Sequence, residues 1–284
     1  MGDVTAVLAQ IQPKLGRVGD NLALVEDTIR QARTTGAELV VFPELALTGY
    51  FLKDLVPEVA LALDSPELTR LKSLSKEIAV AVGFVEVTPD YQFYNSAAWF
   101  EDGELKHLHR KVYLPTYGLF DEQRYLGRGD RFRAFDTRFG RVGLLICEDM
   151  WHLSAPYLLA MDGATTLVCL SSSPARGVEE GDELGSAAAW RTLTASVARF
   201  LTCRVLYANR VGYEDGVAFW GGSHGITPSG VVVAEAPAFH ASLTPVLLPD
   251  ADLRRERIAS PLLRDENLCV TLRELSRIDR ERSR

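Results

Sequence analysis

Three residues of this sequence, Glu44, Lys111 and Cys147, carry side chains that could together perform covalent catalysis. A cysteine needs a nearby base or positive charge before its thiol can act as a nucleophile. A carboxylate can accept the thiol proton and later deliver it to a leaving amine, and a lysine can stabilise the oxyanion of a tetrahedral intermediate. The combination predicts a cysteine nucleophile served by a glutamate and a lysine, a chemistry that needs no histidine.

Each of these residues stands just after a segment with the pattern of a β-strand. Glu44 follows an apolar run that Pro43 ends, Lys111 follows an alternating run, and Cys147 follows the run Val-Gly-Leu-Leu-Ile. Short apolar runs are typical of buried strands. In α/β proteins, functional side chains gather at the carboxyl ends of strands, so we expect the three to lie at one edge of the fold.

The cysteines other than Cys147 have ordinary interpretations. Cys169, Cys203 and Cys269 are widely spaced and form no CxxC pair, which favours free thiols over disulfides or a zinc site. Cys169 and Cys203 lie in apolar runs and are expected to be inert. A lone cysteine is usually a buried, unreactive side chain, so Cys147 is distinguished only by its two prospective partners.

The surrounding pattern alternates strands with helices, which indicates an α/β protein with mixed sheets in a single domain, 1–284. Strands are expected at 4–11, 38–42, 78–87, 142–146, 165–170 and 204–209, and hairpins over 95–109, 131–146 and 222–235. Helices are expected after a cap at 19–21, over 65–78, and at 153–161 and 184–201. The stretch 110–122 is predicted as a loop. The charged segment 250–284 is helix-prone and is expected to be exposed or to extend to a partner subunit.

The composition excludes several functional classes. The 284 residues are 47% hydrophobic and 24% charged, which is typical of a globular protein. The net charge of −7 argues against nucleic acid or an anionic membrane as the main partner. The sequence shows no bilayer-length apolar run and no secretory signal, so we expect a cytoplasmic protein. His107 and His109 share a strand face, but no third ligand is in view, and we expect neither metal nor cofactor.

Three short motifs resemble those of the nitrilase, or carbon–nitrogen hydrolase, superfamily. Phe-Pro-Glu-Leu around Glu44 is similar to its glutamate motif, and Arg-Lys-Val-Tyr-Leu-Pro around Lys111 is similar to its lysine motif. Ile-Cys-Glu-Asp-Met-Trp around Cys147 is similar to its cysteine motif. The motifs occur in the family's order, and weaker similarity continues through 207–212 and 221–223.

This resemblance implies both a fold and a set of roles. The fold would be a four-layer αββα sandwich that pairs with a second copy as αββα–αββα. Glu44 would be the general base, Lys111 the oxyanion stabiliser and Cys147 the nucleophile, with the backbone N–H of Glu148 completing the oxyanion hole. Glu122 matches a second glutamate found in many members, and its expected role is to hold Lys111 and orient the substrate.

The residues in and around these motifs are most similar to the glutaminase domain of glutamine-dependent NAD synthetases, although the sequence contains no SGGxDS-type ATP-pyrophosphatase loop. The acids Glu148 and Asp149 after the cysteine favour an amide over a nitrile substrate. The pocket-shaping candidates, chosen for their polar or aromatic character near the motifs, are Tyr50, Tyr117, Glu148, Trp151, Ser173 and Arg176. Glu148 could meet a substrate amine, and Arg176 could bind a substrate carboxylate bidentately.

These observations predict hydrolysis of a non-peptide linear amide through a cysteine thioester, by a homodimer or higher homo-oligomer. N-carbamoyl-amide hydrolysis and glutaminase-type ammonia supply remain open as alternatives. A serine hydrolase using Ser223 is a further alternative, because 221–225 spells G-x-S-x-G. That motif requires a strand, a sharp turn and a helix, and the following residues instead predict a turn and another strand. A non-catalytic scaffold is the last alternative. It is disfavoured because Glu44, Lys111 and Cys147 all keep side chains capable of catalysis.

Overall fold

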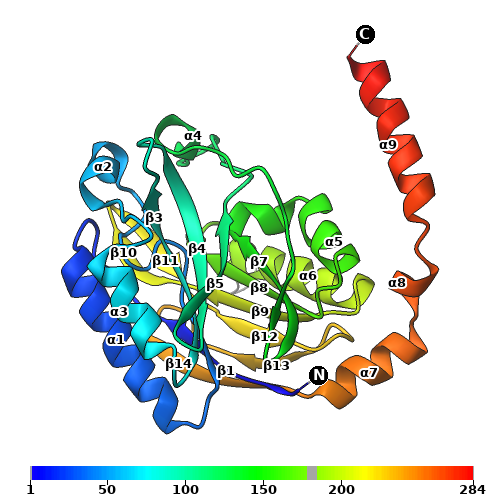
Figure 1. The fold of residues 1–284 in the computed structure, drawn as a ribbon, viewed down its shortest axis with the longest axis horizontal. Coiled ribbons are helices and arrows are strands. Elements are labelled where there is room, and N and C mark those ends of the chain that lie inside the picture. The colour runs from blue at the N-terminus through cyan, green and yellow to red at the C-terminus, as the bar shows by residue number, and fades with distance from the viewer. Residues whose placement is uncertain (1, 178–183, 284) are drawn as a thin grey trace.

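The computed structural model describes residues 2–177 and 184–283. Two six-stranded mixed sheets lie face to face, and helices cover the outer face of each sheet (Figure 1). The largest buried cluster includes residues from the facing sides of both sheets, among them Leu8, Val41 and Leu144. The expected αββα layering is therefore confirmed for the single chain.

The first sheet carries the first of the catalytic candidates and has helices α1 (Val18–Thr34) and α3 (Pro66–Leu74) on its outer face. Its strands are, in spatial order, β14 (Ser242–Leu248), β1 (Val4–Gln10), β2 (Leu39–Val41), β3 (Ala79–Val87), β4 (Phe93–Glu101) and β5 (Glu104–Arg110). Along β1 the burial alternates between the two faces. Ala6 and Leu8 pack between the sheets, and Val7 packs beneath the helices.

The second sheet carries the cysteine and is covered by α5 (Ser154–Met161) and α6 (Gly185–Phe200). Its strands are, in spatial order, β13 (Val232–Glu235), β12 (His224–Ile226), β9 (Arg204–Asn209), β8 (Thr166–Ser171), β7 (Gly140–Ile146) and β6 (Phe135–Thr137). The central strands β7, β8 and β9 are parallel. Their carboxyl ends therefore meet at one edge, as do those of the parallel pair β2 and β3 in the first sheet.

Smaller elements complete the chain. They are the hairpin β10 (Val211–Glu214) and β11 (Val217–Trp220), the short helices η1 (Lys53–Leu55), α2 (Val56–Val59), α4 (Glu122–Tyr125) and η2 (Cys147–Trp151), and the C-terminal helices α7 (Asp250–Ala259), α8 (Leu262–Asp265) and α9 (Leu268–Arg282). Helix α9 projects away from the sandwich (Figure 1) and has no buried residue. Within the described ranges, no helix combines the length and apolarity needed to cross a bilayer.

Several expected boundaries were wrong, and the start of the first helix has an identifiable reason. Helix α1 begins at Val18, ahead of the expected cap, because the Asn21 side chain bonds the Lys14 and Leu47 backbone instead. Helix α3 is capped by Ser65 as expected but ends at Leu74, four residues early. The strand expected from residue 131 forms only from Phe135.

Gly83 shows how the fold accommodates the turn that bears Glu44. A Cβ at this position of β3 would lie 2.5 Å from the Leu45 backbone nitrogen and 2.9 Å from the Glu44 Cα. Any side chain there would displace the turn. A glycine on the neighbouring strand therefore lets the glutamate turn fold down onto the sheet.

Candidate active site

Glu44, Lys111 and Glu122 form a buried charge cluster where the two sheets meet. The Lys111 Nζ lies 2.7 Å from the Glu44 Oε1 and 2.6 Å from the Glu122 Oε1. The side chains of Glu44 and Lys111 are fully buried, and that of Glu122 is 7% exposed. Since an unpaired buried charge is costly, the lysine stabilises the charge of each carboxylate, and the carboxylates stabilise the charge of the lysine.

The Glu44 carboxylate is oriented by groups that the sequence analysis did not identify. The Asn95 Nδ2 donates to its Oε1 at 2.8 Å, and the Ser172 backbone N–H donates to its Oε2 at 2.8 Å. The Ser172 hydroxyl also donates to the Glu44 backbone carbonyl at 3.0 Å. Ser172 follows β8, so the second sheet reaches across to fix a glutamate that belongs to the first.

Cys147 sits at the sharp turn that joins β7 to η2. Its φ of +45° lies in the left-handed region, which non-glycine residues rarely adopt. The Ser171 hydroxyl donates to the Cys147 Sγ at 3.5 Å. Ser171 and Ser172 are consecutive, so one stretch of chain at the end of β8 contacts both the Cys147 thiol and the Glu44 carboxylate. Backbone strain of this kind is often found at functional sites.

Burial and charge set the protonation states of this cluster. Burial alone would lower the pKa of Lys111, but Glu122 and Glu44 hold it well above its ordinary value. Burial raises the pKa of Glu122 to about 7, with Lys111 opposing and Glu44 adding to the effect. Burial and then the charge of Glu44 raise the pKa of Cys147, against the opposing effect of Lys111. The resting thiol is therefore protonated at neutral pH, and a base must remove its proton during attack.

A cleft of about 340 Å³ opens onto Cys147. Five of the six expected pocket-shaping residues line it, namely Tyr117, Glu148, Trp151, Ser173 and Arg176. Trp190 of α6 also lines the cleft, with its ring 5.2 Å from that of Trp151 and its Nε1 donating to the Ser173 Oγ at 2.8 Å. In the stretch after Pro174, residues 178–183 lie outside the described residues.

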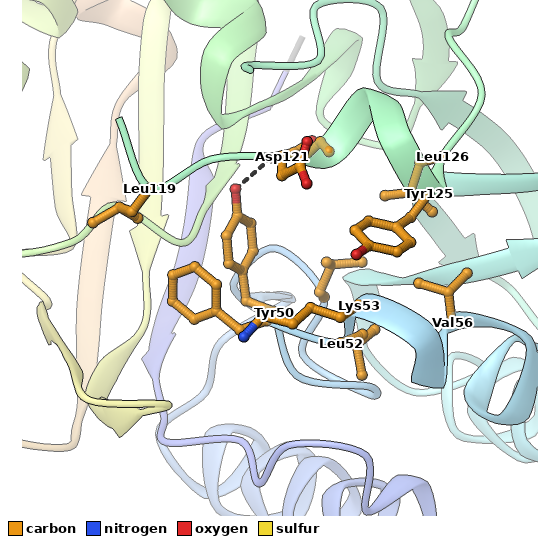
Figure 2. A pocket seen from close by; sticks show the side chains of 11 residues that line it. Tyr50, Leu52, Lys53, Val56, Leu119, Asp121, Tyr125 and Leu126 are labelled. Carbon is orange, nitrogen blue, oxygen red and sulfur yellow. Dashed lines mark hydrogen bonds between the residues drawn. The ribbon is translucent and has the colours of Figure 1, made fainter. Parts of the chain in front are cut away.

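Tyr50, the sixth candidate, lies elsewhere. It lines a neighbouring pocket of about 100 Å³ that does not include Cys147 (Figure 2). Its hydroxyl donates to the Glu122 Oε1 at 2.5 Å, the dashed line in Figure 2. Burial and the charge of Glu122 raise its pKa well above the ordinary value, so it stays a donor. Tyr50 therefore binds Glu122 from the neighbouring pocket and does not line the cleft.

The charged groups of the cleft differ in how they are held. The Tyr117 hydroxyl donates to both carboxylate oxygens of Glu148, at 3.0 and 3.1 Å, and the His152 Nε2 lies 3.8 Å from the Glu148 Oε1. The Arg176 guanidinium lies 4.9 Å from the centre of the Phe120 ring. The cleft thus presents one carboxylate and one guanidinium beside the cysteine.

The remaining candidates from the sequence do not form a second site. Ser223 is fully buried, and its hydroxyl is bonded to the backbone of Asn209 in a turn between strands, without the helix that an elbow requires. His107 stacks on Phe135, while His109 contacts Asp149. Among the described residues, no cluster of three or more His, Cys, Asp or Glu could hold a metal ion. Cys169 and Cys203 are buried, whereas Cys269 is exposed.

Comparisons with known proteins concern both the sequence and the fold. Residues 5–258 match the family model described as carbon-nitrogen hydrolase. A glutamine-dependent NAD(+) synthetase from Acinetobacter baylyi is 32% identical over 236 residues, which are 83% of this chain but only 42% of the synthetase. An N-carbamoylputrescine amidase from Arabidopsis thaliana is 28% identical over 77% of this chain and 78% of its own. A Saccharomyces cerevisiae member of the nitrilase superfamily superposes with a TM-score of 0.80, at 23% identity, covering 92% of this chain and 95% of that structure.

Proposed function

Because the chain belongs to the carbon–nitrogen hydrolase family, we propose that it hydrolyses a linear, non-peptide amide through a thioester on Cys147. The observation that carries this proposal is the junction at 171–172. There, consecutive residues contact the Cys147 thiol and the Glu44 carboxylate, and Glu44 is itself paired with Lys111. Of these three residues, Cys147 lines the cleft, so its thiol is the group that a substrate in the cleft would meet.

In the first half-reaction, Glu44 accepts the proton of Cys147 as the sulfur attacks the amide carbonyl carbon. The Lys111 ammonium and the Glu148 backbone N–H stabilise the oxyanion. The tetrahedral intermediate collapses with cleavage of the C–N bond. Glu44 returns the proton to the leaving nitrogen, and ammonia or an amine departs, leaving a thioester.

In the second half-reaction, Glu44 deprotonates a water molecule that attacks the thioester carbonyl. The same two donors stabilise the new oxyanion, and its collapse breaks the C–S bond. The sulfur regains a proton, and the carboxylic acid leaves. Glu122, supported by Tyr50, keeps the Lys111 ammonium in place throughout.

For the substrate we propose an amide whose remote end carries an ammonium group, a carboxylate or both. Glu148 and Arg176 line the cleft with opposite charges and would bind these groups. Glutamine has this chemistry, and the name of the Acinetobacter baylyi relative includes glutamine. Glutaminase-type ammonia supply is therefore one form of the proposal. The alternative is an N-carbamoyl amine, favoured by the similarity to N-carbamoylputrescine amidase and distinguished by release of carbon dioxide with the ammonia.

We also propose that the chain works as a dimer to which the C-terminal segment contributes. Helix α9 exposes an apolar side formed by Leu272 and Leu275, and helix α5 exposes Leu158, with Leu153 just before it. These residues line a groove of about 440 Å³. Sedimentation of the full chain tests this, because Leu272→Asp together with Leu275→Asp should shift it to a smaller species. A parent chain that sediments as a monomer would contradict the dimer.

The test of the reaction is an ammonia assay with glutamine, ω-amides, carbamoyl amino acids and short aliphatic amides. At least one substrate should be turned over by the parent protein and none by Cys147→Ala, with both proteins equally folded by circular dichroism. Cys169→Ala is a matched control that should remain active, because this other buried thiol lies outside the cleft. Undiminished turnover by Cys147→Ala would refute the thioester.

A further inference from the structure

Asp149 occupies a place between the cysteine turn and the lysine loop that the proposed reaction does not use. Its side chain is fully buried. Its Oδ2 accepts a hydrogen bond from the Ile146 backbone N–H at 3.1 Å, directly before the cysteine. Its Oδ1 accepts from the Val112 and Tyr113 backbone N–H groups, each at 3.0 Å, directly after the lysine.

A histidine completes the set of donors around this carboxylate. The His109 Nε2 lies 2.8 Å from the Asp149 Oδ2, and both side chains are buried. An ionised carboxylate can only accept, so His109 carries a proton on Nε2 and donates it. His109 belongs to β5 and lies two residues before Lys111. Asp149 therefore binds the lysine segment both before and after Lys111.

The two backbones joined by Asp149 both need external support. Cys147 adopts a φ of +45°, a conformation that persists only where its surroundings hold it. Lys111 follows the last residue of β5, where the strand's ladder ends. Its own backbone N–H donates to the Asn95 carbonyl at 2.9 Å, and its carbonyl accepts from Gly129 at 2.7 Å. The carboxylate of Asp149 supplies the remaining tie, directly to the chain that bears the thiol.

We propose that Asp149 is a positioning residue that fixes the Cys147 sulfur relative to the Lys111 ammonium, and that His109 holds Asp149 in the required orientation. This inference rests on the proposed function for its effect on turnover. Its effect on the thiol does not depend on which substrate is used. A buried carboxylate that satisfies three backbone N–H groups from two chain segments fixes both segments more tightly than either fixes itself.

The first test replaces Asp149 with asparagine, which keeps the shape but turns one acceptor into a donor. That donor would face either the Ile146 and His109 donors or the two lysine-loop N–H groups. Because a misplacement of about 1 Å can cost roughly a hundredfold in rate, we expect kcat to fall by about that factor. KM should change by less than about threefold, because the cleft residues are untouched. The rate at which iodoacetamide alkylates Cys147 should fall as well, and its pH profile should shift.

Glu101→Gln is a matched control for a purely structural role. Glu101 is also a buried carboxylate, which accepts from the Arg138 backbone N–H and from the Trp99 indole, each at 3.1 Å. It lies at the far end of β4 from Asn95. We expect this variant to lower thermal stability while leaving kcat and the alkylation profile of Cys147 unchanged.

A second pair of variants keeps the inference testable if Asp149→Asn does not fold. His109→Gln retains a donor at the position of the imidazole Nε2, whereas His109→Leu removes it. We expect His109→Leu to slow both turnover and Cys147 alkylation, and His109→Gln to restore them to within about threefold of the parent.

The outcomes separate this inference from the proposed function. The inference is overturned if Cys147 in folded Asp149→Asn is alkylated by iodoacetamide as fast as in Glu101→Gln and turnover is also equal. It is overturned as well if Cys147 is alkylated at equal rates in the two His109 variants. If the parent hydrolyses no amide, but Cys147 alkylation slows in Asp149→Asn and in His109→Leu, the positioning role stands and the substrate assignment falls.

Discussion

The buried charge cluster and the mouth of the cleft lie a few side chains apart but are built differently. Glu44 and Lys111 are fully buried and paired with each other, and the Glu44 carboxylate also accepts hydrogen bonds from Asn95 and Ser172. At the mouth, Tyr117 and Trp151 expose 57% and 42% of their surface. The difference teaches that the groups proposed to react are fixed by the fold, whereas the groups proposed to face the substrate can be exchanged at little cost to folding stability. Interior substitutions should therefore change kcat and stability, and mouth substitutions should change KM.

The largest expected effect comes from Lys111→Met. It leaves two buried carboxylates without their cation, and removing one member of a buried pair costs about 3–5 kcal/mol. The same change removes the proposed oxyanion donor, and such a donor alone is worth roughly a hundred- to a thousandfold in kcat. Urea unfolding and the ammonia assay measure the two effects. Lys53→Met is the control, since Lys53 forms an exposed pair with Asp215 and should alter neither. Equal free energies of unfolding for Lys111→Met and Lys53→Met would contradict the difference between the interior and the surface.

The next effect is a pH dependence that belongs to the interior. Burial raises the pKa of Glu122 from 4.5 to about 7, so between these values the folded state holds a proton that the unfolded chain has lost. Stability from this group is fully present below about pH 4.5 and is lost as the pH rises towards 7. In that window the parent should lose up to about 1.4 kcal/mol per pH unit relative to Glu122→Gln, which cannot titrate. Unfolding curves from pH 4 to 8 test this, and parallel pH profiles would refute the assignment.

A smaller effect is expected at the mouth from Glu148→Gln. A hydrogen bond to a charged group is worth about 1.5–3 kcal/mol, so KM for an amide that carries an ammonium group should rise by roughly ten- to a hundredfold. The kcat value should change little, because only the side chain of Glu148 is altered. A neutral aliphatic amide serves as the internal control. A loss confined to kcat would place Glu148 with the interior group instead.

The smallest effect is expected from Trp151→Ala. Trp151 meets Trp190 edge to face at a ring distance of 5.2 Å. Such a pair contributes about 0.5–1.5 kcal/mol, so we expect the free energy of unfolding to fall by about that amount. A substrate contact of similar size with the exposed part of the ring would raise KM about two- to tenfold. A large loss of stability would mean that this side chain supports the fold rather than the mouth.

The same division explains what the sequence could predict. Glu44, Lys111 and Cys147 each lie in a contiguous motif, and their placement at strand ends follows from local patterns. The groups that orient them come from far along the chain: Asn95 is 51 residues from Glu44, and Ser172 is 128 residues away. No local pattern reveals such pairs. The available signal is a serine or an asparagine that lies within a strand or just after it, as Asn95 and Ser172 do.

The fold shows a similar limit. The α/β class followed from the alternation of strands and helices, and the four layers followed from the family resemblance. Strand β14 was not predicted, although it pairs along the whole of β1. Its partner lies more than 230 residues away, and Pro245 interrupts its strand pattern. Tyr50 was expected in the cleft, yet its hydroxyl reaches Glu122 from the other side. In each case a long-range contact decided the outcome.

The most direct test of the central claim is the mass of the protein during turnover. Intact-protein mass spectrometry of the parent, quenched with acid during turnover, should show an adduct equal to the acyl part of the substrate. The parent is used because Glu44 serves both half-reactions, so its replacement would slow formation of the thioester as well as its hydrolysis. Peptide mapping should place that adduct on Cys147, and hydroxylamine should remove it. Turnover by the parent with no adduct on Cys147, or with an adduct on Ser223, would contradict the account.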